Sequence, residues 1–269
     1  MNKMRKTILG ISSFFVIFVL TMTSVIAPTM VNTLHTCEAT PDPNVDGKID
    51  KAVEWKAGWP ITVTLYDLTN QANKIDIEII SVYGADQIVY YAVTVPDTGI
   101  NPEDYFFMVF RTHEVDPIVE IPNIDGRFNK EHDVKFMWLH NNHSMDAFTT
   151  GTWFNWADDP SNGGSDDGFG KCRNNRSHTT IEMSFPFDTS DLNGFDVILS
   201  LNATVELFLW YHDEDVGRDY CQIRENDADW DYLEQIIDST KCGPIPLPYV
   251  FLGLIGISVI TVIIRGRRK

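Results

Sequence analysis

The sequence predicts a mainly β protein whose central body is an antiparallel β-sandwich. Between residues 60 and 212, short runs rich in Val, Ile, Phe and Tyr show period-two alternation and are separated by Asp, Asn, Gly and Pro. Helical spacing is confined to 224–238, through Trp230, Leu233 and Ile237. Eight extended runs with so little helix are typical of two packed antiparallel sheets.

Each of these runs is a predicted strand. The predicted strands are residues 61–66, 75–83, 87–95, 104–111, 133–140, 179–185, 195–202 and 205–212. In the run 75–83, isoleucines at every second position face one side, whereas Asp76 and Glu78 face the other. The connections 112–132 and 151–178 are longer than usual loops, and connections of that length are often functional.

The N-terminal segment is predicted to direct export. An uncharged apolar run at 8–27 follows a short basic start, which is the layout of a secretory signal. The run is longer than the apolar core of most signals. We therefore interpret residues 1–31 as a signal peptide or, alternatively, as a retained N-terminal anchor.

The C-terminal segment is predicted to cross the membrane. Residues 247–264 are apolar throughout, long enough to span a bilayer, and are followed by the basic residues 265–269, which we expect in the cytoplasm. This layout resembles the C-terminal signals of many archaeal surface proteins. We expect a single-pass protein of the cell membrane, with one domain at 38–243 on the extracellular side.

Composition limits the partners of that domain. The chain has 38 Asp and Glu against 21 Lys and Arg, a formal net charge of −17. Because this charge repels phosphate backbones, nucleic acid is excluded as a partner. A hydrophobic content of 43% also excludes a chain that is disordered throughout. We expect an extracellular glycan or another surface protein as the partner.

The four cysteines lie in the exported part, where thiols oxidise. Two disulfides are therefore expected, and they allow three connectivities. We favour Cys172–Cys221 together with Cys37–Cys242, because the second pair would clamp the two ends of the domain.

Two acidic stretches are candidate calcium sites. The first offers oxygen ligands at alternate positions, namely Asp42, Asn44, Asp46 and Asp50. Val53 stands where the pattern requires a bidentate acid, so an acidic turn before the first strand is the alternative. The second stretch contains Asp166 and Asp167, for which a solvated acidic loop is the alternative.

One family resemblance emerges from short motifs. The segment Asp46-Gly47-Lys48-Ile49-Asp50, followed by Glu54-Trp55, resembles the opening of family 9 carbohydrate-binding modules. It also resembles their DOMON-like relatives, which include the haem-binding subunit of ethylbenzene dehydrogenase. Segments 86–93, 104–110 and 181–187 continue the resemblance in the same order. The resemblance implies a jelly-roll-like topology and a binding role without catalysis.

The predicted carbohydrate site lies in the connection 151–178. A sugar binder needs flat aromatic faces for stacking, beside carboxylates and amides that hydrogen-bond hydroxyl groups. The residues expected to bind are Trp153, Asn155, Trp156, Asp158 and Asp159. The alternative for each tryptophan is a place inside the sandwich. We predict a non-catalytic cell-surface protein that binds carbohydrate, with calcium as a structural ion.

Two other functions are kept as alternatives. One is electron transfer by bound haem b, for which the candidate axial ligands are Met108, Met137, His140 and His212. The other is a structural or adhesive component of a surface layer. We do not expect an enzyme, because the sequence has no hydrolase, metalloprotease, P-loop or dinucleotide-binding fingerprint.

Overall fold

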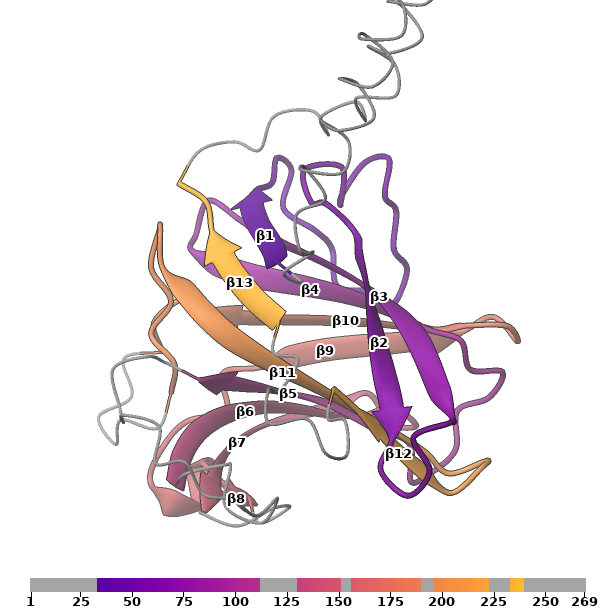
Figure 1. The fold of residues 1–269 in the computed structure, drawn as a ribbon. Coiled ribbons are helices and arrows are strands. Elements are labelled where there is room, and N and C mark those ends of the chain that lie inside the picture. The colour runs from indigo at the N-terminus through magenta and orange to yellow at the C-terminus, as the bar shows by residue number, and fades with distance from the viewer. Residues whose placement is uncertain (1–32, 112–129, 151–155, 190–195, 223–232, 240–269) are drawn as a thin grey trace, which may run out of the picture.

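The computed structural model describes residues 33–111, 130–150, 156–189, 196–222 and 233–239 (Figure 1). Within these ranges the chain is mainly β, as predicted, and contains no α-helix. Its strands are β1 (Thr33–Glu38), β2 (Ile61–Asp67), β3 (Lys74–Tyr83), β4 (Ile88–Val95), β5 (Tyr105–Arg111), β6 (Lys130–Trp138), β7 (His143–Thr150), β8 (Trp156–Asp158), β9 (Phe169–Asn174), β10 (Thr179–Pro186), β11 (Thr204–Asp213), β12 (Arg218–Cys221) and β13 (Leu233–Ile237). A short 3-10 turn, η2 (Pro160–Asn162), follows β8.

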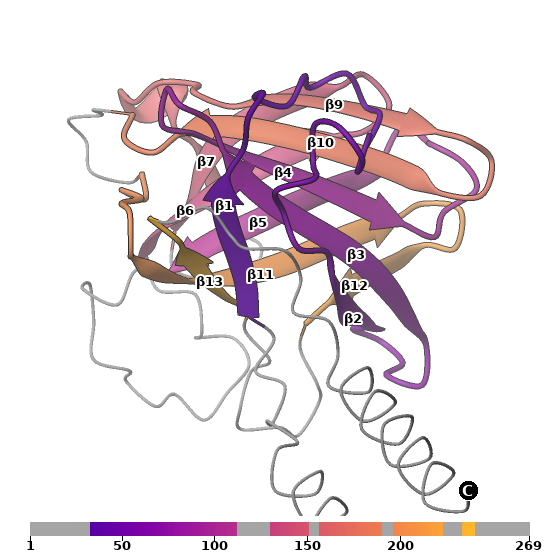
Figure 2. The same cartoon turned by 90° about the horizontal axis from the view of Figure 1, so that it is seen from above.

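The strands form one continuous hydrogen-bonded sheet that closes on itself. Its main path runs β8-β7-β6-β5-β11-β12-β2-β3-β4-β10-β9, while β1 bridges β3 and β13, and β13 pairs with β11. The strands β11, β12, β2, β3, β1 and β13 therefore make a closed six-strand barrel. One arm, β4-β10-β9, extends from β3, and a second arm, β5-β6-β7-β8, extends from β11 (Figures 1 and 2).

Pairing is not antiparallel throughout, which corrects the predicted fold. Strand β1 runs parallel to both β13 and β3, whereas the other pairings are antiparallel. The expected pair of separate sheets is also wrong, because β1 and β13 on one side and β2 and β12 on the other join the layers. Parallel pairing between segments about 200 residues apart leaves no local sequence signal.

Seven of the eight predicted strands are present, and the one predicted at 195–202 is not. Residues 196–202 form no strand, although Val197 and Leu199 are both buried. The amide of Leu199 donates to the carbonyl of Phe187 at 2.7 Å, outside any ladder. An irregular segment with buried residues at alternate positions therefore gave the same sequence pattern as a strand. Residue 195 lies outside the described residues.

The helical spacing at 224–238 is wrong as a prediction in the part of that segment that the structure describes. Leu233–Ile237 is strand β13, in which Leu233, Gln235 and Ile237 are buried at alternate positions. Leu233 and Ile237 are four residues apart, so the same pair fits a helix face and a strand face. Residues 223–232 lie outside the described residues.

The main core lies where the inner faces of the two arms meet. Tyr91 on β4 stacks on Phe185 of β10, with their ring centroids 5.5 Å apart. Phe110 on β5 approaches Phe185 edge-on at 5.4 Å, so aromatic rings cross from one arm to the other. Leu207 and Leu209 on β11 complete this cluster. Apolar burial therefore holds the arms against each other.

Both predicted membrane segments lie outside the described residues. These are 8–27, within the predicted signal or anchor 1–31, and 247–264, with the basic tail 265–269. Within the described ranges, no helix has the length and apolarity needed to cross a bilayer.

The chain between β1 and β2 is pinned to the first arm by one buried carboxylate. Glu182 on β10 accepts hydrogen bonds from the backbone N–H groups of Asp46, at 2.8 Å, and Gly47, at 2.7 Å. Its second oxygen accepts from the indole N–H of Trp55 at 3.1 Å. Gly47 has φ +82°, and a Cβ there would lie 3.0 Å from the carbonyl of Cys172. Burial raises the pKa of Glu182, and the three donors oppose that shift.

Glu182→Gln should destabilise the fold by about 1–3 kcal/mol, because the amide group that replaces one oxygen faces a buried donor and leaves it unpaired. Urea denaturation measures the change in the free energy of unfolding. Glu78→Gln is the matched control, since Glu78 pairs with Lys51 at the surface and its loss should cost much less. Equal losses for the two variants would contradict the role given to Glu182.

The favoured disulfide Cys172–Cys221 is absent. Cys172 on β9 is a free thiol that donates to the carbonyl of Leu139 at 2.8 Å. Cys221 on β12 is buried in a different apolar cluster, with Trp210. Two cysteines that pack in separate clusters on different strands cannot be bridged without moving the backbone. Cys37, buried in β1, does form a disulfide, as expected. Cys242 lies outside the described residues, so the pairing Cys37–Cys242 stays a prediction.

Cys172 should be recovered as a free thiol from the purified chain. Alkylation with iodoacetamide in denaturant without reductant, followed by peptide mass analysis, should label it completely. In the folded chain at pH 8 labelling should be slow, because burial raises the pKa of Cys172 to about 11 and little thiolate forms. Recovery of Cys172 in a disulfide would show the pairing described above to be incorrect.

Candidate functional site

The outer side of the second arm carries a continuous layer of aromatic rings. On β5, Phe106 and Met108 face the main core, so Tyr105 and Phe107 point to the opposite side. The layer, called here the outer aromatic face, consists of Tyr105, Phe107, Phe136, Trp138, Trp156 and Trp210.

The rings of this face are stacked in register across neighbouring strands. Tyr105 lies 5.2 Å from Phe136 on β6, measured between ring centroids. Phe107 stacks on Trp210 of β11 at 5.4 Å with an interplanar angle of 15°. Such offset-stacked contacts add about 0.5–1.5 kcal/mol per pair beyond area burial. The rings are therefore held in fixed orientations.

Trp156 extends the face to the edge of the arm. It opens β8, is 39% exposed, and lies 5.3 Å from Phe136 between ring centroids. This is the position expected for a ligand-stacking residue, although it belongs to a strand where a loop was expected. The predicted partners Trp153 and Asn155 lie outside the described residues.

A carboxylate on β12 closes the opposite end of the face. One oxygen of Asp219 accepts hydrogen bonds from the Tyr105 hydroxyl, at 3.2 Å, and the Trp210 indole, at 3.1 Å. The same oxygen lies 2.8 Å from Nδ1 of His212, whose ring stacks on Tyr105 at 4.8 Å. The side chain of Asp219 is 34% exposed, so it is oriented by the face and open to solvent.

The predicted binding acids Asp158 and Asp159 organise the turn after β8. Asp158 accepts hydrogen bonds from the backbone and hydroxyl of Ser161. Asp159 is buried and packs against Gly164, where a Cβ would meet its carboxylate. The two acids form a compact support beneath Trp156.

Neither predicted calcium stretch brings its acids together. Asp46 pairs with Lys48, and Asp50 accepts from the amides two and three residues on. Asp42 contacts the amide of Ala85 at 3.4 Å. The other residues lie apart: Asn44 and Asp166 are exposed, and Asp167 accepts from Ser165. Among the described residues, the groups of three acids close enough to share a metal ion lie elsewhere.

One such group lies at the turn between β11 and β12. Oxygen atoms of Asp97, Asp213 and Asp215 all lie within 4.8 Å of one another. Asp97 is buried and accepts from the hydroxyl groups of Tyr211, at 2.8 Å, and Thr179, at 3.1 Å. Burial and the neighbouring acids raise the pKa of Asp213. Crowded carboxylates of this kind could hold a metal ion.

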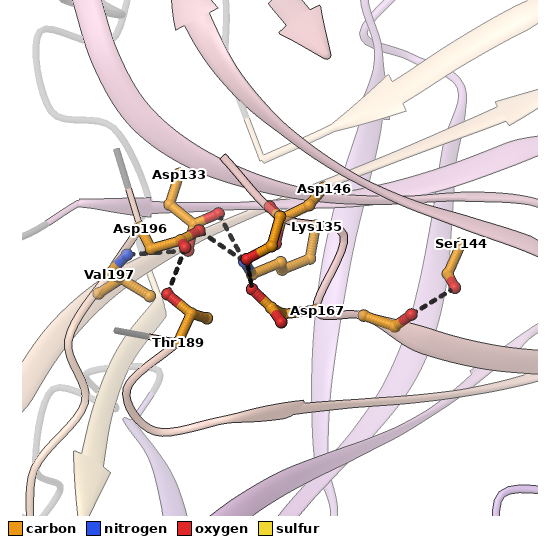
Figure 3. A network of polar contacts seen from close by, with 10 residues as sticks. Asp133, Lys135, Ser144, Asp146, Asp167, Thr189, Asp196 and Val197 are labelled. Carbon is orange, nitrogen blue, oxygen red and sulfur yellow. Dashed lines mark hydrogen bonds and ion pairs between the residues drawn. The ribbon is translucent and has the colours of Figure 1, made fainter. Parts of the chain in front are cut away.

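The other group surrounds a lysine. Asp133, Asp146 and Asp196 lie within the same limit of one another, and Nζ of Lys135 sits among them (Figure 3). Its distances to their oxygens are 3.2, 2.5 and 3.1 Å, in that order. The ammonium group therefore fills the place that a metal ion would take.

The residues considered for haem ligation are spread over different surroundings. Met108 and Met137 lie in the main core. His212 belongs to the other side of the second arm, against Tyr105, and His140 is exposed beyond the end of β6. Neither histidine therefore shares the surroundings of the two methionines.

Sequence reasoning missed Tyr105 and Asp219, and it considered His212 only as a haem ligand. A signal existed in the run Tyr105-Phe106-Phe107, where adjacent aromatic residues must face both sides of a strand. Asp219 reaches these rings because β12 pairs with β11, and the sequence gives no sign of that pairing. No family model matches this chain, and no curated protein is significantly similar to it.

Proposed function

We propose that this chain is a non-catalytic cell-surface protein that binds carbohydrate on its outer aromatic face. The observation that supports this proposal is the exposed ring of Trp156, which continues a stacked aromatic layer reaching Asp219. The layer crosses from β8 to β12, which is about 24 Å at the usual spacing of strands. Phe136 and Trp210 within the layer are buried, so a ligand on Trp156 would also meet the half-buried rings of Tyr105, Phe107 and Trp138. A row of that length suits an oligosaccharide.

The chemistry of the face suits sugar recognition. Pyranose rings present flat C–H faces that pack on aromatic side chains, and their hydroxyl groups need oriented polar partners. Tyr105, His212 and Asp219 supply a hydroxyl, an imidazole and a carboxylate in fixed positions. Asp219 thereby takes the part that the sequence suggested for Asp158 and Asp159.

The surface location rests on the predicted terminal segments. A signal or anchor at 1–31 and a membrane helix at 247–264 would hold the β domain outside the cell. The resemblance to family 9 carbohydrate-binding modules and DOMON-like domains agrees with a binding role, and its motif residues Gly47, Trp55 and Glu182 do meet in one hydrogen-bonded cluster. We also propose that the joined layers are a variant of the jelly-roll-like topology which that resemblance implies.

Calcium is the metal ion proposed for the acidic turn. Carboxylate oxygens are the ligands that calcium prefers, and Asp97, Asp213 and Asp215 crowd together at one end of β11. A bound divalent cation would relieve their mutual repulsion. Its role would be structural, since the turn joins β11 to β12, which carries Asp219.

Trp156→Ala should abolish binding of the purified ectodomain to the glycans it recognises on an array, because the variant removes the exposed stacking ring. Phe169→Ala is the matched control: Phe169 is 51% exposed on β9, in the other arm, and its loss should leave binding unchanged. A wild-type ectodomain that binds no glycan, yet self-assembles with calcium, would instead favour a structural surface-layer component.

Calcium should stabilise the fold through the acidic turn. A ligand at a hundred times its dissociation constant adds about 2.7 kcal/mol, which corresponds to roughly 5–10 °C in Tm for a domain of this size. Differential scanning calorimetry at pH 7 measures the shift. The pKa of Asp213 is raised above its unfolded value, so in the apo protein stability is lost as pH rises through that range, and the gain from calcium should shrink toward pH 4.

Asp215→Asn should remove most of the calcium effect, because it deletes one of the three ligands. Asp42→Asn is the matched control from the calcium stretch predicted near the N-terminus, and it should respond to calcium like the wild type. The reverse result, with only Asp42→Asn losing the effect, would place the ion at 42–50 and refute the site at the turn.

A further inference from the structure

Lys135 is an unusual residue because its charged end is enclosed in the protein. Its side chain is 2% exposed, on the inner side of β6, directly opposite Asp146 in the ladder with β7. The ring of Phe185 covers the ammonium group, with Nζ 5.3 Å from the ring centroid. A lysine is seldom buried so fully, since its charge must be removed from water.

Asp146 differs from the other two acids around this lysine. Asp133 accepts a hydrogen bond from the amide of Val197 at 3.0 Å, and Asp196 accepts one from the hydroxyl of Thr189. Asp146 is wholly buried, and its Oδ1 has no hydrogen-bond partner among the described residues. In the part of the chain that the structure describes, Asp146 pairs with Lys135, which its other oxygen touches at 2.5 Å.

The charges of this cluster do not balance. Three carboxylates and one ammonium carry a net charge of −2 if all are ionised, in a region that excludes water. Burial and the neighbouring Asp133 raise the pKa of Asp146 to about 8, so this acid holds its proton at neutral pH. The three surrounding acids raise the pKa of Lys135, so its nitrogen rests as an ammonium group. A neutral carboxylic acid beside that nitrogen can condense with it once the ammonium has given up one proton.

We propose that Lys135 and Asp146 form an intramolecular isopeptide bond that joins β6 to β7. The reacting atoms are Nζ of Lys135 and Cγ of Asp146, and the two side chains already touch. Because both partners are fixed in one ladder, the reaction needs no further loss of translational freedom, which removes one large part of the barrier that a bimolecular reaction meets in solution.

The reaction balances without an oxidant or a co-reactant. The ammonium group first gives one proton to the carboxylate of Asp133, whose Oδ1 is 3.2 Å away. The neutral amine attacks Cγ of protonated Asp146, a C–N bond forms, and the C–O bond to the hydroxyl group breaks. That hydroxyl leaves as water with a proton from nitrogen, so the products are an amide, one water molecule and protonated Asp133.

The bond removes the electrostatic cost that the ionic cluster carries. Before reaction, an ammonium and a carboxylate are both desolvated. Afterwards the ammonium and the carboxyl group of Asp146 are replaced by a neutral amide, and the remaining acids are Asp133, held by Val197, and Asp196, held by Thr189. Replacing buried ions with a neutral bond of similar volume is favourable in a water-free interior.

Tryptic digestion and tandem mass spectrometry of the purified full chain test the proposal. Trypsin does not cleave after an acylated lysine. The cross-linked chain should therefore yield residues 131–171 as one peptide, lighter than its sequence by one water molecule and without fragment ions between Lys135 and Asp146. Quantitative recovery of 131–135 and 136–171 from folded wild-type protein would overturn the proposal, whether or not any variant folds.

Three variants sharpen the test. Lys135→Arg keeps the positive charge but should release peptide 131–135 ending in arginine. Asp146→Asn should give the same cross-linked product as the wild type, with ammonia as the leaving group. Asp133→Asn removes the proton acceptor and should lower the cross-linked fraction formed in a given time by about a hundredfold. A wild-type rate in Asp133→Asn would refute the role of Asp133.

Discussion

Strand β5 is apolar on both sides, and the two packed layers of the second arm follow from this constraint. On β5, Phe106 and Met108 face the main core, whereas Tyr105 and Phe107 face outward. A sheet that is apolar on one side only can leave its other side to water, but a two-sided sheet needs cover on both. On the outer side Phe136 and Trp210 are buried, whereas Trp156 at the edge is exposed, and we therefore propose that ring as the point where a partner binds.

The acidic character of the chain is concentrated where it has structural consequences. On the inner side of the second arm, three aspartates enclose Lys135, and at the turn after β11 two others, Asp213 and Asp215, crowd around Asp97. The two groups differ in what balances their negative charge. The first contains its own cation, Lys135, whereas the second could hold a cation from solution. We therefore propose a covalent bond at the first group and a metal ion at the second.

Local patterns predicted the strands that pair with their sequence neighbours. The alternation in β3 and β4 was sufficient because their partners follow directly in the chain. It could not reveal β1, which pairs in parallel with the distant β13. It also misassigned β13, because Leu233 and Ile237 are four residues apart and fit both a helix and a strand. Trp156 was predicted from composition, whereas Asp219 and the group around Asp97 depend on strands far apart in sequence that only the fold brings together.

The two proposals meet on one pair of strands. Lys135 and Asp146 face inward from β6 and β7, and the adjacent ladder pair, Phe136 and Met145, faces outward into the aromatic cluster. Phe136 is also the ring that Trp156 touches, and β8 has only three residues to hold that tryptophan in place. A bond between β6 and β7 would therefore fix the support of the exposed ring. A binding surface that is rigid before its ligand arrives loses less entropy on association, so cross-linking the inner side would strengthen recognition on the outer side.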